Sequence, residues 1–149
     1  MAIRIGDHIP AFSLPLPDGK SFDISKSTDK HHVIFFYPRD ETSGCIKEAC
    51  SFRDNYETFQ KAGAEVIGIS SDSKKSHQLF QRKHRLPFKL LSDEAGKVRK
   101  LFGVPKTLGL FPGRVTYIVD KEGVVRHIFN SQFNAEQHVK EALEILSKM

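Results

Sequence analysis

The sequence predicts an α/β fold, in which a mixed central β-sheet carries helices on both faces and follows an N-terminal β-hairpin. Two continuous apolar segments, 33–36 and 66–69, are typical of strands that are buried on both faces. Segments with helical periodicity alternate with these strands, as in a sheet covered by helices. Two apolar segments near the C-terminus flank the turn 120–123, which predicts an antiparallel hairpin. The length of 149 residues suits a single domain, residues 1–149.

Each element is predicted from its local pattern. The turn residues Pro17, Asp18 and Gly19 lie within 12–22 and predict the first hairpin. Pro38 ends the first buried strand, expected over 32–37, and a polar loop 38–44 follows. The later elements are expected as helix 45–61, strand 65–70, helix 73–84 with Leu79 and Phe80 inward, strand 87–91, helix 95–102, loop 106–113, strands 115–119 and 124–129, and helix 135–148. This order is of thioredoxin type, although other three-layer α/β folds share it.

Composition and charge exclude several classes of protein. With 39% apolar and 28% charged residues, the chain is globular rather than disordered. The net charge of +5 is spread along the chain, and the densest basic run, 82–85, is interpreted as a solvated helix end. Aromatic residues are not interleaved with basic ones, so no nucleic-acid partner is expected. No membrane partner is expected either, because no run of 18 apolar residues occurs, and no signal peptide is recognised.

The two cysteines, Cys45 and Cys50, are the most informative residues. Without an export signal they indicate either core thiols or redox chemistry. Cys45 follows a buried strand and begins a helix, where free N–H groups and the helix dipole favour a thiolate. Two buried, inert thiols remain the alternative, since free cysteine is among the most buried residue types. The chain has no C-x-x-C motif and no set of residues with metal-ligand spacing, so no metal site is expected.

The segment around Cys45 resembles the peroxiredoxins, most closely the bacterioferritin comigratory protein or peroxiredoxin Q subfamily. The resemblance is carried by Tyr37-Pro38, Thr42-Ser43-Gly44-Cys45 and Glu48-Ala49-Cys50-Ser51-Phe52-Arg53, and it extends through 7–18, 66–70 and 112–120. It implies a thiol-dependent peroxidase that reduces hydrogen peroxide and organic hydroperoxides. It also implies that a thioredoxin-like or glutaredoxin-like donor reduces the enzyme, and that no metal, haem or flavin cofactor is needed.

The resemblance also implies roles for individual residues. Cys45 corresponds to the peroxidatic cysteine, which becomes a sulfenic acid, and Cys50 to the resolving cysteine, which forms an intramolecular disulfide with it. The hydroxyl of Thr42 corresponds to the group that bonds the thiolate and the peroxide. The guanidinium of Arg114 corresponds to the group that keeps the thiolate charged and polarises the peroxide.

Pro38 and Gly44 are expected in the peroxide pocket, where Pro38 shields the sulfur from water. Ser43 stands where the family usually carries proline, so this turn is expected to be less rigid. Cys50 falls in the apolar helical pattern and is expected to be buried in the reduced protein. The protein is expected to be a monomer in the cytoplasm, although a processed organellar protein would have the same sequence features.

Two other functions fit the same residues. The first is a binding protein with inert thiols, either a chaperone of thioredoxin fold or a basic nucleic-acid-associated protein. The second is a general thiol–disulfide oxidoreductase. Consumption of hydrogen peroxide with and without Cys45 distinguishes the peroxidase from both.

Overall fold

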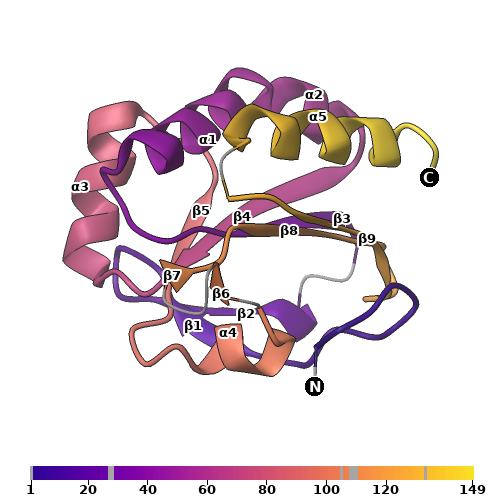
Figure 1. Cartoon of the computed structure of the whole chain (residues 1–149), viewed down its shortest axis with the longest axis horizontal. Helices are drawn as coiled ribbons and strands as arrows, with labels where there is room; N and C mark the ends of the chain where they lie inside the picture. The colour runs from indigo at the N-terminus through magenta and orange to yellow at the C-terminus, as the bar shows by residue number, and fades with distance from the viewer. Residues whose placement is uncertain (1, 27–28, 105, 108–110, 133) are drawn as a thin grey trace.

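A five-stranded mixed sheet forms the centre of the protein (Figure 1). The structure is a computed structural model that describes residues 2–26, 29–104, 106–107, 111–132 and 134–149. The strand order is β5-β4-β3-β8-β9. These strands are β3 (His31–Phe36), β4 (Ala64–Ser70), β5 (Lys89–Ser92), β8 (Val115–Val119) and β9 (Val125–Asn130). Strands β3, β4 and β5 are parallel, whereas β8 and β9 are antiparallel to their neighbours.

Both faces of this sheet are covered, as the continuous apolar strands predict. Along β3, Phe35 faces one core and Phe36 faces the other, and both side chains are almost fully buried. The first face packs against α1 (Ser43–Asp54), α2 (Tyr56–Lys61), α3 (Lys74–His84) and α5 (Ala135–Leu146). The second face packs against the hairpin β1 (Ser13–Pro15) and β2 (Ser21–Asp23), the 3-10 turn Ile24–Lys26, and α4 (Lys97–Phe102). The expected α/β fold with its N-terminal hairpin is therefore confirmed.

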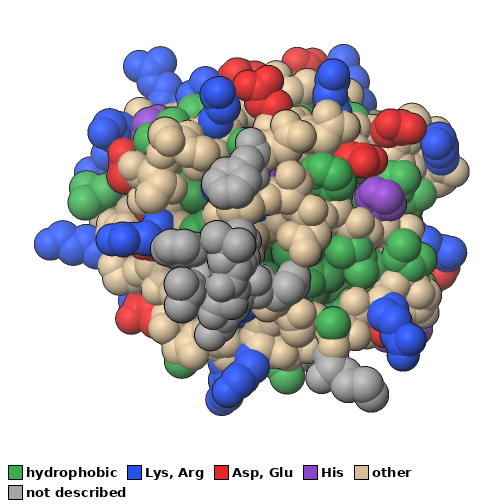
Figure 2. All heavy atoms as spheres, viewed as in Figure 1, with side chains coloured by type: hydrophobic (Ala, Val, Ile, Leu, Met, Phe, Trp, Pro, Cys, Tyr) green, Lys and Arg blue, Asp and Glu red, His purple; other side chains and the backbone are tan. Residues whose placement is uncertain are grey.

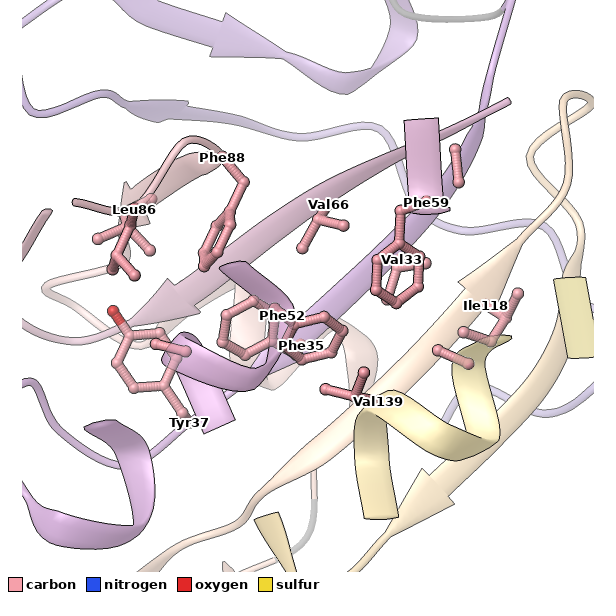
Figure 3. Packing of buried hydrophobic residues seen from close by; sticks show 14 of the residues in the cluster. Val33, Phe35, Tyr37, Phe52, Phe59, Val66, Leu86, Phe88, Ile118 and Val139 are labelled. Atoms are coloured by element: carbon pink, nitrogen blue, oxygen red, sulfur yellow. The ribbon is translucent and has the colours of Figure 1, made fainter. Parts of the chain in front are cut away.

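Aromatic packing fixes the helix that follows β3. Phe52 of α1 stacks on Phe35 of β3 with ring centroids 4.5 Å apart (Figure 3). Phe59 of α2 and Phe88, which lies just before β5, pack against the same Phe52 ring. Such fully buried rings each contribute roughly 2–3 kcal/mol by burial alone. The packing holds α1 firmly at the carboxyl end of β3.

The structure contradicts the prediction that Leu79 faces inward, the prediction of one helix over 45–61, and the prediction of a plain loop over 106–113. Leu79 is 55% exposed because the inward face of α3 carries His77 and Phe80, which are three positions apart, while Leu79 points away. The predicted helix 45–61 is two helices. The side chain of Asn55 donates to the carbonyl of Ser51 at 2.8 Å and ends α1 there.

The predicted loop 106–113 contains a short antiparallel ribbon of β6 (Lys106–Thr107) and β7 (Phe111–Pro112). Residues 108–110 of that loop lie outside the described residues. None of the helices in the described part of the chain is long and apolar enough to cross a membrane.

Candidate active site

Cys45 lies in the first turn of α1, at the carboxyl end of β3. Thr42 precedes this helix with an extended backbone, and its carbonyl accepts the first helical hydrogen bond, from the N–H of Ile46, at 2.8 Å. The unpaired N–H groups of the first turn point towards the N-terminal end of α1, close to Cys45. The Cys45 side chain is only 1% exposed. The sulfur therefore lies in a largely dehydrated environment, where neighbouring charges act strongly.

Arg114, the residue directly before β8, provides the charge next to Cys45. Its Nη2 donates to the Cys45 Sγ at 3.2 Å, and its Nη1 donates to Oε1 of Glu48 at 2.6 Å. Its Nε donates to the carbonyl of Gln132 at 3.1 Å, so all three guanidinium nitrogens are fixed. The structure thus brings Cys45 and Arg114 together, as the resemblance implies. Their catalytic roles stay predictions.

The charge of this guanidinium is retained in spite of its burial. Burial opposes the charged form, but Glu48 and Cys45 raise the pKa of Arg114 above its ordinary value. A second arginine, Arg99 of α4, donates to the carbonyls of Tyr37 and Gly113 at 3.0 and 3.1 Å. Burial lowers the pKa of Arg99. Arg99 ties the residue after β3 to the residue before Arg114, and so fixes the two backbone segments that carry the site.

Thr42, Pro38 and Gly44 surround Cys45 in the sequence and are placed differently. The hydroxyl of Thr42 is exposed and donates to the carbonyl of Arg39 at 3.0 Å, and it does not cap α1. Pro38 is half-buried. A Cβ atom on Gly44 would lie 3.0 Å from Nη2 of Arg114, so glycine leaves room for the guanidinium.

Cys50 lies in the same regular helix as Cys45, and both thiols are free. Its side chain is half-buried, so the expectation that Cys50 is buried is wrong. The reason is that Ala49 and Phe52 occupy the inward face of α1, which turns Cys50 towards its edge.

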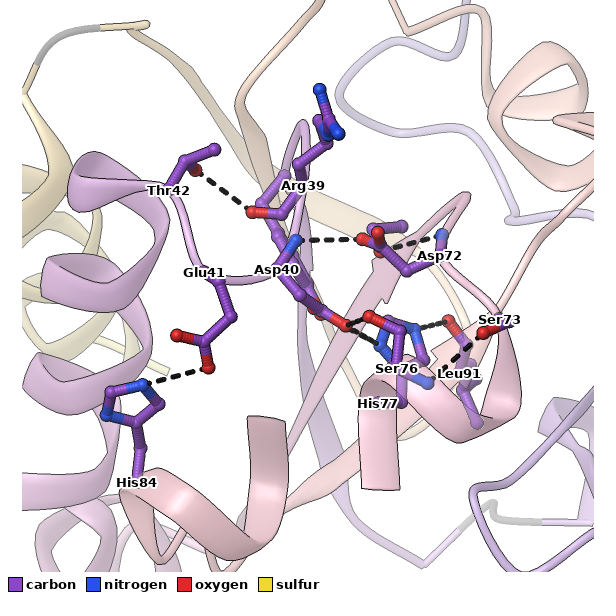
Figure 4. Close-up of polar contacts among 12 residues, drawn as sticks. Arg39, Asp40, Glu41, Thr42, Asp72, Ser73, Ser76, His77, His84 and Leu91 are labelled. Atoms are coloured by element: carbon purple, nitrogen blue, oxygen red, sulfur yellow. Dashed lines mark hydrogen bonds and ion pairs between the residues drawn. The ribbon is translucent and has the colours of Figure 1, made fainter. Parts of the chain in front are cut away.

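Asp40 and Glu41 attach the loop before α1 to α3 (Figure 4). Asp40 accepts from Ser76 at 2.8 Å and contacts Nδ1 of His77 at 2.7 Å. Glu41, which has a positive φ of 63°, contacts His84 at 3.2 Å at the other end of α3. Two carboxylates therefore hold the loop that leads into Cys45, and they stabilise its strained backbone.

Asp40, Asp72 and His77 are the described residues that could hold a metal ion, because their ligand atoms lie within 4.8 Å of one another. Each of them already has protein partners. Nε2 of His77 bonds the carbonyl of Leu91 at 3.0 Å, and Asp72 accepts from the backbone N–H of Asp40 at 2.8 Å. The donors present within the protein account for the arrangement of this cluster.

Sequence reasoning did not identify Glu48, Arg99 or His138. Glu48 lies three residues after Cys45 and thus on the same face of α1, which is a signal that was available. An acidic residue at a buried helical position is a second signal, since unpaired burial of a carboxylate is costly. Arg99 and His138 lie far from Cys45 in the sequence, and no local pattern marks them.

Comparisons with known proteins show which family this chain belongs to. A family model described as the AhpC/TSA family matches residues 5–128. Peroxiredoxin Q, chloroplastic, from Populus jackii is 54% identical over 148 residues, which are 99% of this chain and 70% of that protein. The protein of the same name from Suaeda salsa is 54% identical over 145 residues, which are 97% of this chain and 68% of that protein.

Solved structures give the same result. Peroxidoxin BcpB from Mycobacterium tuberculosis superimposes with a TM-score of 0.91 at 34% identity, covering 99% of this chain and 98% of that one. A PrxQ mutant from Xylella fastidiosa superimposes with a TM-score of 0.91 at 27% identity and the same coverage.

Proposed function

The chain belongs to the AhpC/TSA family and is a peroxiredoxin, and from this premise we propose that Cys45 attacks hydrogen peroxide and organic hydroperoxides while Cys50 resolves the product. A peroxiredoxin is a thiol-dependent peroxidase that acts on a peroxide and is reduced by a thioredoxin-type donor. The observation that supports Cys45 as the attacking thiol is its hydrogen bond from Arg114 at 3.2 Å in the first turn of α1.

The first step is a nucleophilic displacement on the peroxide. The Cys45 thiolate attacks the oxygen that bears hydrogen, the S–O bond forms and the O–O bond breaks. The other oxygen leaves as an alkoxide or hydroxide and takes up one proton, and Cys45 becomes a sulfenic acid. Negative charge moves from sulfur to oxygen in this step, so a fixed guanidinium beside the sulfur stabilises the transition state.

Thr42 is proposed to turn its hydroxyl from the Arg39 carbonyl to the bound peroxide, with Pro38 and Gly44 forming the adjacent wall. The present Thr42–Arg39 bond, at 3.0 Å, involves an exposed hydroxyl, so little free energy opposes the rotation. Such a hydroxyl can accept from the peroxide and donate to the thiolate.

In the second step, Cys50 displaces water from the sulfenic acid of Cys45 and forms the disulfide. Positions i and i+5 of an α-helix are about 8–9 Å apart at Cα, whereas a disulfide tolerates about 7 Å at most. We therefore propose that the start of α1 unwinds before the bond forms. Two thiols of a thioredoxin-like donor then reduce the disulfide and return Cys45 to the thiol state.

The remaining properties are also proposals. Residues 1–149 are proposed to form one domain that acts as a monomer without a cofactor. Lys and Arg side chains lie apart around the margin of the face in Figure 2, among Asp and Glu, an arrangement unlike a basic nucleic-acid stripe. The relatives from Populus jackii and Suaeda salsa are named as chloroplastic, so the proposed compartment is the cytoplasm or, after processing, an organelle that contains thioredoxin.

A coupled assay with thioredoxin, thioredoxin reductase and NADPH tests the proposal. Wild-type protein should consume hydrogen peroxide and an organic hydroperoxide continuously. The Cys45→Ser variant should consume neither, because the attacking sulfur is absent. Turnover that persists in Cys45→Ser would contradict the proposal.

A further inference from the structure

Glu48 has one carboxylate oxygen that is buried without a hydrogen-bond partner. The side chain is 0% exposed, and its Oε1 is paired with Arg114. Its Oε2 has no hydrogen-bond partner among the residues that the structure describes. Nδ1 of His138 on α5 lies 3.5 Å from this oxygen. An unpartnered buried carboxylate oxygen costs free energy, so its environment calls for an explanation.

The protonation of His138 follows from its own hydrogen bonds. Nε2 lies 2.8 Å from the carbonyl of Ser131, which can only accept, so Nε2 carries a proton. Burial lowers the pKa of His138 to about 4; the Ser131 carbonyl opposes this shift and Arg114 adds to it. The ring is therefore neutral near pH 7, and Nδ1 has a lone pair. The hydroxyl of Thr116 donates to that lone pair at 2.8 Å.

Glu48 Oε2 and His138 Nδ1 are thus two acceptors that face each other across 3.5 Å. One proton on Glu48 would remove the conflict, because Oε2 would then donate towards Nδ1 and share its lone pair with the Thr116 hydroxyl in a three-centre hydrogen bond. Burial raises the pKa of Glu48 to about 7, although Arg114 lowers it. A proton can therefore be held in this position at neutral pH.

The charges around Glu48 link this proton to the sulfur. Cys45 and Glu48 of α1 share one cation, Arg114 directly before β8, through its two terminal nitrogens. His138 faces Glu48 from α5, and Thr116 from β8 bonds His138. Arg99 of α4 is a second positive charge, and it interacts electrostatically with Cys45. A single guanidinium in a dry site balances one contacting anion much better than two.

We propose that Glu48 and His138 hold one proton while Cys45 is a thiolate, and that Glu48 loses this proton when peroxide consumes the thiolate. This inference rests on the proposed function. Once Cys45 is a neutral sulfenic acid, Arg114 has only Glu48 as an anionic partner, so the carboxylate form becomes favourable. Glu48 and His138 are positioning residues here, because they act on the sulfur through Arg114.

The proton balance of the peroxide step is then closed within the protein. The thiolate, the peroxide and protonated Glu48 give the sulfenic acid, an alcohol or water, and ionised Glu48. One S–O bond forms, one O–O bond breaks, and the departing oxygen gains the equivalent of the proton that Glu48 loses. The solvent supplies no net proton, and the proposal concerns this balance rather than a direct transfer.

Infrared difference spectroscopy measures this change directly. The Cys50→Ser variant stops at the sulfenic acid and is compared before and after one equivalent of hydrogen peroxide at pH 6, about one unit below the pKa of Glu48. The difference spectrum should lose the C=O stretch of a protonated carboxyl and gain carboxylate bands. Adding Glu48→Gln should remove both signals. Adding His138→Phe should move the C=O stretch to higher frequency, because the acceptor is gone.

The control is Glu141→Gln, which removes a half-buried carboxylate on the same helix as His138, 3.5 Å from His127. It should leave the signal unchanged. A spectrum without a carboxyl change, in protein that mass analysis shows to be sulfenic acid, would overturn the proton proposal and leave the peroxidase intact. A signal that survives Glu48→Gln would also overturn it. Failure to form sulfenic acid at all would instead contradict the proposed function.

Discussion

The Nη2 atom of Arg114 donates a hydrogen bond to the Sγ of Cys45 at 3.2 Å, although the two residues are 69 positions apart in the sequence. The same guanidinium donates to Glu48 and to the carbonyl of Gln132, so all three of its nitrogens donate a hydrogen bond. An ammonium group is a point charge that cannot reproduce these three directions. The Arg114→Lys variant should therefore react with peroxide about 10²–10³-fold more slowly, as measured by stopped-flow kinetics of Cys45 oxidation.

Arg126→Lys is the matched control. Arg126 is an exposed arginine of β9 that pairs with Asp120 at 2.6 Å, and the same substitution there should leave the rate unchanged. Equal rates in wild type and Arg114→Lys would mean that this guanidinium does not act on the sulfur.

Gly44 provides a test that separates stability from reactivity. Alanine at this position would favour the helix by up to about 1 kcal/mol. Its Cβ would lie 3.0 Å from Nη2 of Arg114 and displace the guanidinium. Gly44→Ala should keep or raise the free energy of unfolding in urea, while its rate with peroxide falls roughly tenfold. A variant with unchanged rate would show that the contact between Arg114 and Cys45 tolerates this displacement.

The pH dependence of stability tests the Glu48–His138 pair. The pKa of Glu48 is raised to about 7 and that of His138 is lowered to about 4, whereas unfolded Glu and His titrate near 4.5 and 6.5. Between pH 4.5 and 6.5 the folded pair holds its proton on Glu48, and the unfolded pair holds one on His138. Both states bind one proton, so the pair adds almost no pH dependence in this window.

Replacing either Glu48 or His138 should reveal the pH dependence of stability that the other residue contributes. In Glu48→Gln only the unfolded state binds the His138 proton, so stability should rise with pH from about 4 to 6.5, by up to about 1.4 kcal/mol per unit. In His138→Phe only the folded state binds the Glu48 proton, so stability should fall as pH rises from about 4.5 to 7. Urea unfolding of reduced protein across this range measures both slopes relative to wild type. Slopes of the same sign in the two variants would refute the assigned protonation states.

The sequence was sufficient for the sheet and for the position of Cys45, because these depend on local patterns. The run Val33–Phe36 and a helix that begins close to Cys45 are readable without tertiary information, although α1 begins at Ser43 rather than at the predicted Cys45. The prediction that Leu79 of α3 faces inward is wrong, because the buried side chain at the inward face is His77. Its burial is made possible by Asp40, 37 positions away, and such a partner cannot be seen in a local window.

The residues that contact the site also could not be predicted from local sequence patterns alone. Glu48 was visible as a polar residue on an apolar helix face, but its role depends on two distant partners, Arg114 directly before β8 and His138 of α5. The exposure of Cys50 depends on the register of α1 against Phe35, which is a packing property. Residues that act through distant contacts therefore require the structure.

Disulfide formation should unwind the start of α1 and leave its surroundings intact. Amides 45–52 should exchange hydrogen much faster after oxidation, because two cysteines five positions apart in a helix cannot be bridged. Strand β3 and helix α2 should change little, since Asn55 already interrupts the helix and Phe59 remains buried. Arg53, which donates to the carbonyl of His84 at 2.7 Å, should mark the limit of unwinding. Hydrogen exchange with mass detection compares the two states. Equal protection of α1 in both, with the intramolecular disulfide verified, would show that the bond forms without unwinding.

The most direct test of the account is the product of one equivalent of hydrogen peroxide, identified by intact mass and peptide mapping in wild type and in Cys50→Ser. Wild type should lose two hydrogen atoms and contain a single Cys45–Cys50 disulfide. Cys50→Ser should gain one oxygen atom, located on Cys45. An oxygen atom on any other residue of Cys50→Ser, or oxidised wild-type protein in which Cys45 and Cys50 are not joined to each other, would contradict the account.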